Sequence, residues 1–207
     1  AVIAMGRWGG RELSYSSDAD ALIVIGTSDD PDAARAALSV VTTLRRLLAQ
    51  PGPDPALELD LDLRPEGKGG PMVRTLASYA AYYAKWASTW EAQALLRAGV
   101  GAGDRALAAE FLASIDDVRY PEGGLTAKQV IEIRKLKARM EAERMPRGSD
   151  PKRNVKLGPG GLSDVEWVVQ LVQLRHGHAE PSLRTPMTLS ALAAEEASGL
   201  LERGDAA

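Results

Sequence analysis

The segment from Gly9 to Asp20 constrains the fold of this chain more than any other. It joins two short apolar runs, Ala1–Met5 and Ala21–Ile25, each of which is long enough for a β-strand. A Gly-Gly pair follows the first run, and Asp18 and Asp20 open the second. Side chains of an extended chain alternate between its two faces, so these two carboxylates point to the same side. The pattern therefore predicts a strand, a glycine turn and a second strand that begins with an acidic pair.

The acidic pair predicts a metal site. Two like charges at this spacing repel each other unless a cation lies between them. Carboxylate oxygens are the ligands that Mg²⁺ prefers, commonly together with the phosphates of a substrate. Gly9 and Gly10 have no side chains, so their backbone N–H groups are expected to approach a phosphate closely. A solvated turn is the alternative interpretation of an Asp-x-Asp sequence taken alone.

A third carboxylate comes from residues Leu57 to Arg64, where leucines alternate with charged residues as in a half-buried strand. The acids on its polar face are Glu58, Asp60 and Asp62. A helical pattern from Ala33 to Leu48 separates this strand from the acidic pair and fits a crossover connection. If the two strands are neighbours, three carboxylates can hold the two Mg²⁺ ions of a two-metal phosphoryl or nucleotidyl transfer. The alternative is a strand face of solvated acids.

The apolar period changes after the turn-rich segment 65–71, from that of a strand to that of a helix. The sequence therefore predicts an α+β fold. We expect a small mixed β-sheet core in residues 1–73 and an all-helical subdomain in residues 74–207, which completes the active-site cleft.

Two patterns stand out in the helical part. Tyr79, Tyr83, Trp86 and Trp90 share one helical stripe, which predicts packing in a core. A second helix, Ser163 to Arg175, is apolar except for one polar face. The residues of that face are Ser163, Glu166, Gln170 and Gln173. A polar face on a buried helix either lines a wet cleft or pairs internally. The cleft is favoured because a glycine-rich helix start binds anions.

Composition narrows the function classes. The 207 residues carry a net charge of −3, which argues against a broad nucleic-acid footprint. The chain has no cysteine, so it has no disulfide and no thiolate zinc site. No apolar run reaches transmembrane length, so neither nucleic acid nor membrane is expected as a partner. The chain begins inside an apparent strand without Met, and we expect it to be a fragment of a longer protein.

Five segments, in order, resemble the catalytic module of the bifunctional glutamine synthetase adenylyltransferase/adenylyl-removing enzyme, which belongs to the polymerase-β-like nucleotidyltransferase superfamily. They are residues 1–25, Asp60-Leu61-Asp62-Leu63-Arg64-Pro65-Glu66-Gly67, 90–95, 132–140 and 160–167. The sequences Ser-Ser-Asp-Ala-Asp at 16–20, Met-Glu-Ala-Glu-Arg at 140–144 and Ser-Asp-Val-Glu-Trp at 163–167 resemble the C-terminal, adenylylating copy of that module, in its actinobacterial form.

The resemblance implies a cytoplasmic enzyme that transfers AMP from ATP to a tyrosine of glutamine synthetase, releases pyrophosphate and thereby down-regulates nitrogen assimilation. A PII-type signalling protein would act through regions outside this chain. Two alternatives stay open. The first is that the chain is the adenylyl-removing copy, which converts AMP-tyrosine to ADP by phosphorolysis. A non-catalytic, nucleotide-sensing module is the third interpretation.

The resemblance also implies roles for single residues. Asp18 and Asp20 match the metal-binding pair and Asp60 the third acid, so these three are the expected catalytic and Mg²⁺-binding residues. Asp62 stands where many members have arginine. Arg64 and Lys68 are expected to neutralise the triphosphate, with a solvated basic turn as the alternative. The residues expected to bind ATP are Gly9, Gly10, Ser16, Ser17, Arg64, Lys68 and Glu166.

Overall fold

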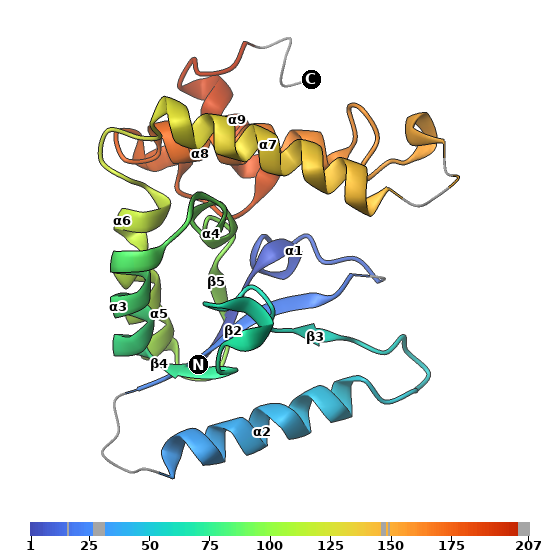
Figure 1. Cartoon of the computed structure of the whole chain (residues 1–207), viewed down its shortest axis with the longest axis vertical. Coiled ribbons are helices and arrows are strands. Elements are labelled where there is room, and N and C mark those ends of the chain that lie inside the picture. Colours follow the sequence, from blue (N-terminus) through green and yellow to red (C-terminus); the bar gives the residue numbers. More distant parts are fainter. Residues whose placement is uncertain (16, 27–31, 146–147, 149, 203–207) are drawn as a thin grey trace. The chain divides into compact units, whose positions relative to one another are not determined.

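The computed structural model describes residues 1–15, 17–26, 32–145, 148 and 150–202. It forms two compact units (Figure 1). The sheet unit comprises Ala1–Ala87 and Arg97–Val118, and the helical unit comprises Ser88–Leu96 and Arg119–Ala207. The expected α+β fold with a small mixed sheet is confirmed. Residues 74–87 and 97–118 group with the sheet in this division. The domain boundary at residue 73 stays a sequence-based prediction.

Five strands build the sheet: β1 (Val2–Ala4), β2 (Ala19–Ile25), β3 (Leu59–Asp60), β4 (Val73–Thr75) and β5 (Gly99–Ala102). The order is β3-β2-β1-β5, and β4 also pairs with β2. β1 is antiparallel to β2 and β5, whereas β3 and β4 are parallel to β2. Parallel neighbours need a crossover connection, and α2 (Ala33–Leu48) supplies it between β2 and β3.

Two strands differ from the expectation. The strand expected over Leu57–Arg64 is confirmed only for β3, because the chain turns after Asp60 and the Arg64 side chain binds the backbone of that turn. β5 is a strand that the sequence analysis did not predict. Its two glycines hide the strand period, and a Cβ on Gly101 would lie 3.1 Å from the Trp8 ring.

The core on one face of the sheet fixes the direction of the acidic pair. α2 packs on that face over a cluster of buried residues: Ala19, Ala21, Ile23, Val41, Leu59 and Leu61. α3 (Leu76–Trp86) and α5 (Arg105–Ser114) meet through Tyr79 and Phe111, whose rings are edge to face at 5.2 Å. A register slip of one residue would turn Asp20 into the apolar cluster. Burial of alternate residues therefore holds the carboxylates on the other face.

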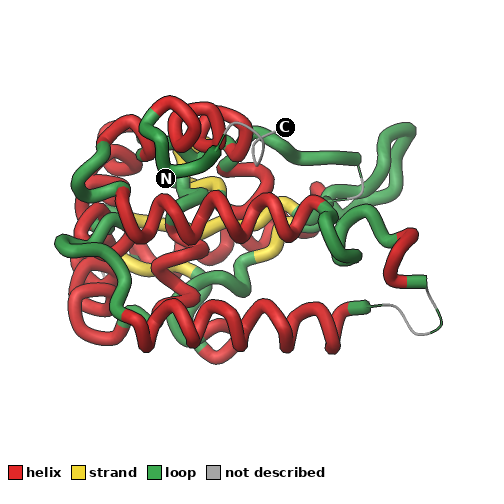
Figure 2. The backbone as a smooth tube through the Cα atoms, turned by 90° about the horizontal axis from the view of Figure 1, so that it is seen from above, coloured by secondary structure: helices red, strands yellow, loops and turns green. Residues whose placement is uncertain are grey.

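The remaining elements are short turns and helices. α1 (Gly6–Gly9) and η1 (Gly67–Gly69) belong to the sheet unit, and α6 (Asp116–Arg119) spans the division. The helical unit holds α4 (Thr89–Leu95), α7 (Ala127–Arg144), η2 (Pro151–Arg153), α8 (Leu162–His176), η3 (Pro181–Leu183) and α9 (Thr188–Ala197). Helices predominate in the whole chain (Figure 2). No helix in the described ranges is long and apolar enough to cross a membrane.

The polar face of α8 pairs internally, so the expected wet cleft is wrong for its second half. Gln170 Oε1 accepts a hydrogen bond from Gln93 Nε2 at 2.8 Å. Gln173 Nε2 donates to the carbonyl oxygens of Leu183 and Thr185, both at 2.7 Å. The reason is that α4 and the segment around η3 lie against α8 and supply partners that sequence spacing does not reveal.

The aromatic stripe is divided between two helices. Tyr79 and Tyr83 are buried as expected, but Trp86 is 64% and Trp90 40% exposed. α3 ends at Trp86, and a capping box between Ser88 and Glu91 starts α4. The prediction of core packing is therefore confirmed for the tyrosines and wrong for the tryptophans.

Candidate functional site

The register of β2 and β3 brings two of the expected metal ligands together. Asp20 lies directly opposite Asp60, and Ala19 lies opposite Leu59. Paired residues of neighbouring strands project from the same face, with the strands about 4.8 Å apart. Both aspartates are half-buried, whereas Asp18 is exposed one residue before β2 begins. The sheet thus places Asp20 beside Asp60, with Asp18 at its edge.

The three carboxylates do not form a closed ligand set. Among the residues that the structure describes, no three His, Asp or Glu side chains are grouped closely enough to hold a metal ion. Carboxylates that carry like charges separate when no cation lies between them, and one oxygen of Asp60 already accepts a hydrogen bond from the Asp62 backbone N–H at 2.7 Å. The donor chemistry nevertheless fits Mg²⁺, because every candidate donor is a hard carboxylate oxygen.

The glycine turn adjoins this pair, but not in the expected way. A Cβ on Gly6 would lie 2.2 Å from Asp20 Oδ2, so the turn touches the carboxylate. The N–H groups of Gly9 and Gly10 donate to the carbonyl oxygens of Met5 and Gly6, at 2.8 and 3.1 Å. Both donors are thus used within the turn, and the expected role of Gly9 and Gly10 in phosphate binding stays a prediction.

Arg97 explains why the turn needs glycines. A Cβ on Gly9 would lie 1.7 Å from the Arg97 carbonyl oxygen, and one on Gly10 would lie 2.2 Å from Arg97 Nη2. The buried guanidinium donates to the Gly6 carbonyl oxygen at 3.0 Å and to Glu12 Oε2 at 2.6 Å. Sequence analysis missed this residue, although an arginine inside the apolar run 95–98 was the available signal. Arg97 positions the turn that contacts Asp20.

The basic residues after β3 have different surroundings. Arg64 is only 7% exposed, and its guanidinium donates to the carbonyl oxygens of three residues in the same loop. It also lies 3.3 Å from Asp62, and Lys68 Nζ lies 3.4 Å from the other oxygen of that carboxylate. Arg64 therefore positions the loop, while Lys68 stays exposed. With two cations on Asp62, Asp60 is the better candidate for a metal ligand.

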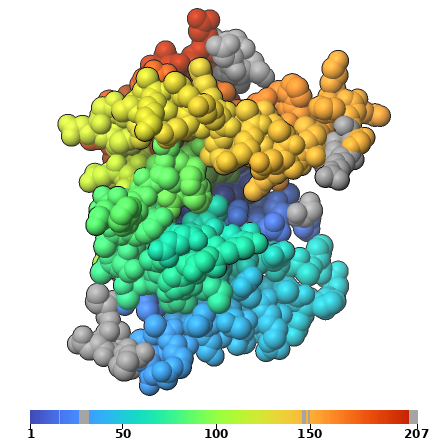
Figure 3. Space-filling model, viewed as in Figure 1, coloured from blue at the N-terminus to red at the C-terminus, as the bar shows by residue number. Residues whose placement is uncertain are grey.

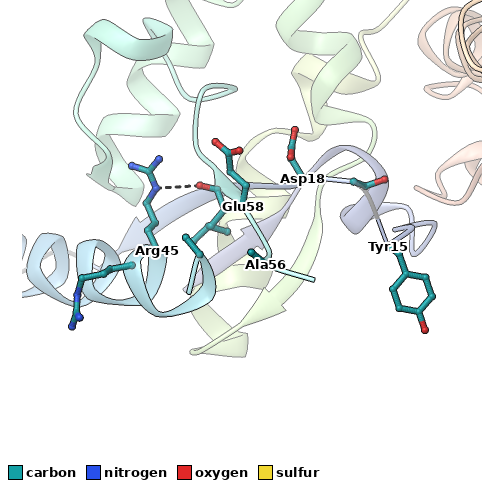
Figure 4. A pocket seen from close by; sticks show the side chains of 9 residues that line it. Tyr15, Asp18, Arg45, Ala56 and Glu58 are labelled. Carbon is teal, nitrogen blue, oxygen red and sulfur yellow. Dashed lines mark hydrogen bonds between the residues drawn. The ribbon is translucent and has the colours of Figure 1, made fainter. Parts of the chain in front are cut away.

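A cavity of about 490 Å³ lies beside Asp18 (Figure 4). It is lined by the last turn of α2, the segment before β3 and the loop before β2, including Ser17. Asp18 and Glu58 each lie one residue before a strand, and Figure 4 shows both side chains projecting to the same side. Glu58 is thus a fourth acid near the site that the sequence indicated only as part of a strand face. The prediction for Ser16 falls outside the described residues.

Glu166 lies on α8 in the helical unit and is half-buried. Its expected role in nucleotide binding stays a prediction. Nearby on the same helix, Asp164 bonds to Lys137 of α7, and this contact lowers the pKa of the Asp164 carboxyl. Burial disfavours the charge on Lys137, but its hydrogen bonds to Asp164 and Glu141 outweigh burial and raise its pKa. This ion pair joins α7 to α8.

Comparison with known proteins identifies the relatives of this chain. A family model described as glutamate-ammonia ligase adenylyltransferase matches residues 1–114, and one described as GlnD PII-uridylyltransferase matches residues 133–207. Three relatives are each named bifunctional glutamine synthetase adenylyltransferase/adenylyl-removing enzyme. The protein of Cutibacterium acnes is 61% identical over 98% of this chain and 20% of its own length. The protein of Streptomyces avermitilis is 60% identical over 100% of this chain and 21% of its own length. The protein of Mycobacterium tuberculosis H37Rv is 54% identical over 93% of this chain and 20% of its own length.

The chain spans about a fifth of the length of these relatives. The match to the first family model covers the whole sheet, the acidic pair, Asp60 and Arg97. The chain therefore belongs to the glutamate-ammonia ligase adenylyltransferase family.

Proposed function

We propose that this chain transfers AMP from ATP to a tyrosine hydroxyl of glutamine synthetase. The observation that carries the proposal is the pairing of β2 with β3. This pairing sets Asp20 beside Asp60, and Asp18 lies two residues before Asp20. Family membership and the names of the relatives support the reaction and the acceptor. We also propose a cytoplasmic location, and regulation by a PII-type protein through regions outside this chain.

Asp18, Asp20 and Asp60 are the residues that would hold Mg²⁺, which when bound neutralises phosphate charge in such a transfer. In the reaction the phenol oxygen attacks the α-phosphorus of ATP in line. The bond to the bridging oxygen breaks, and pyrophosphate leaves with the electron pair. A free tyrosine has a pKa of about 10, so a base must accept its proton. Asp60 is the candidate base, because it shares a face with the acidic pair.

The chain's other residues position these groups. Ser17 lines the cavity beside Asp18, and the exposed Lys68 can offset the charge of the pyrophosphate. Arg64 and Arg97 hold the two loops on either side of the carboxylates through backbone carbonyl oxygens. Their role in this proposal is positioning.

The test is incorporation of label from α-labelled ATP into unmodified glutamine synthetase. The chain should transfer AMP in the presence of Mg²⁺, and the double variant Asp18→Asn with Asp20→Asn should not, while its circular dichroism stays unchanged. Transfer by the double variant would refute the metal-pair assignment. Release of ADP from AMP-modified synthetase and phosphate, with no labelling, would instead identify the adenylyl-removing copy. Absence of Mg²⁺-dependent ATP binding by calorimetry would leave a non-catalytic module.

A further inference from the structure

A surface groove of about 360 Å³ lies in the helical unit, between the start of α4 and the middle of α7. α4 and α7 pack against each other (Figure 1), and the outer side of α7 is visible as a yellow band in Figure 3. The residues that matter here are Thr89 and Trp90 from α4, and Glu132, Lys135, Leu136 and Arg139 from α7. The site described above uses none of them.

Trp90 provides the apolar part of the groove. Its side chain is 40% exposed although its stripe predicts a core position. Leu136 continues the apolar surface on α7 and is half-buried. Tryptophan and arginine are enriched at protein interfaces, and they carry a large share of the binding energy where they are central to a contact. An exposed indole beside an arginine is therefore typical of a protein-binding surface.

Two unpaired cations border the indole. Lys135 and Arg139 are four residues apart on α7, both exposed, and neither has an ion-pair partner in the part of the chain that the structure describes. The acid of the groove, Glu132, already accepts a hydrogen bond from Thr89 Oγ1 at 2.8 Å. Lys137 on the same helix is different, because it pairs with two carboxylates. The groove thus offers positive charge that has no carboxylate partner within the described part of the helical unit.

We propose that this groove docks an acidic segment of glutamine synthetase that carries one apolar side chain. Charge complementarity selects the acidic segment, with carboxylates on Lys135 and Arg139 and the apolar side chain on Trp90. The inference rests on the proposed function, because an enzyme that modifies one tyrosine of a folded protein gains from contacts away from the reacting atoms. It adds a protein-recognition surface that is separate from the carboxylates.

The test compares two charge-reversal variants of the full chain. Lys135→Glu with Arg139→Glu alters the groove, and Arg134→Glu with Arg175→Glu makes the same charge change at exposed residues outside it. Trp90→Ala is a third variant. Binding of glutamine synthetase from Streptomyces avermitilis is measured first without ATP, at low and moderate salt. Steady-state AMP transfer is then measured against synthetase concentration and, separately, against ATP concentration.

We expect the groove variants to weaken synthetase binding by about tenfold or more, to raise the KM for synthetase, and to leave kcat and the KM for ATP unchanged. The control pair should bind like the parent chain. Equal binding by the groove and control variants, or no binding by the parent chain, would overturn the proposal. Binding of synthetase without any AMP transfer would refute the proposed function alone. The comparison of binding between the groove and control variants would still decide whether the groove is the docking site. Thermal unfolding of each variant shows that it is folded.

Discussion

Glu195 of α9 is a buried acid whose carboxylate charge no described hydrogen-bond donor offsets. Its replacement by glutamine should stabilise the chain in a pH-dependent way. The residue is 0% exposed, and neither carboxylate oxygen has a hydrogen-bond partner among the residues that the structure describes. Burial raises the pKa of this carboxyl from 4.5 to about 8. The folded state therefore keeps a proton that the unfolded state releases between these two values.

The sign and size of the effect on stability follow from the difference between the pKa values of Glu195 in the folded and unfolded states. Because the folded state binds more protons, the free energy of unfolding falls as the pH rises from 4.5 towards 8, by about 1.4 kcal/mol per pH unit. The loss amounts to about 3 kcal/mol at pH 7 and about 5 kcal/mol above pH 9. Glutamine has a similar shape and does not titrate. Glu195→Gln should therefore match the parent chain near pH 4.5 and exceed it increasingly at higher pH.

The assay is urea unfolding followed by tryptophan fluorescence, since Trp167 lies on α8, which packs against α9. Parent and variant are compared at about pH 5, 7 and 9. The matched control is Glu143→Gln, an exposed position on α7, which should show no growing difference. A stability difference between Glu195→Gln and the parent that is the same at all three pH values would refute the argument, because an uncharged packing effect does not depend on pH.

Two further predictions concern the sheet unit. Asp60→Asn should lower the AMP-transfer rate by about 100-fold or more, whereas Asp62→Asn should keep most of it, because two cations already occupy Asp62; equal losses in a labelled-ATP assay would contradict this ranking. Gly9→Ala should cost about 3 kcal/mol of stability, because its Cβ would lie 1.7 Å from the Arg97 carbonyl oxygen. In Gly26→Ala the Cβ meets no described residue within 4 Å, so this variant is the matched control; similar midpoints of thermal unfolding for both would disprove the packing argument.

The sequence by itself determined the features that depend on neighbouring residues. The patterns of residues 18–25 and 57–64 predict two strands, and the helical pattern of 33–48 predicts the crossover between them. The structure has these elements as β2, β3 and α2. The longest helix among the described residues, α7, begins at a capping box between Thr126 and Gln129, which is a local sequence signal. Backbone periodicity is local, so a single sequence reveals it.

The tertiary structure alone decided which partner each polar or aromatic group finds. Sequence spacing could not show that Arg64 binds loop carbonyl oxygens or that Arg97 closes over the glycine turn, because the partners of Arg97 lie up to 91 residues away. It equally could not show that Trp90 is exposed, since the break between α3 and α4 divides a continuous-looking stripe. A side chain's neighbours depend on contacts between distant segments, and those contacts exist only once the sheet and the helices have packed.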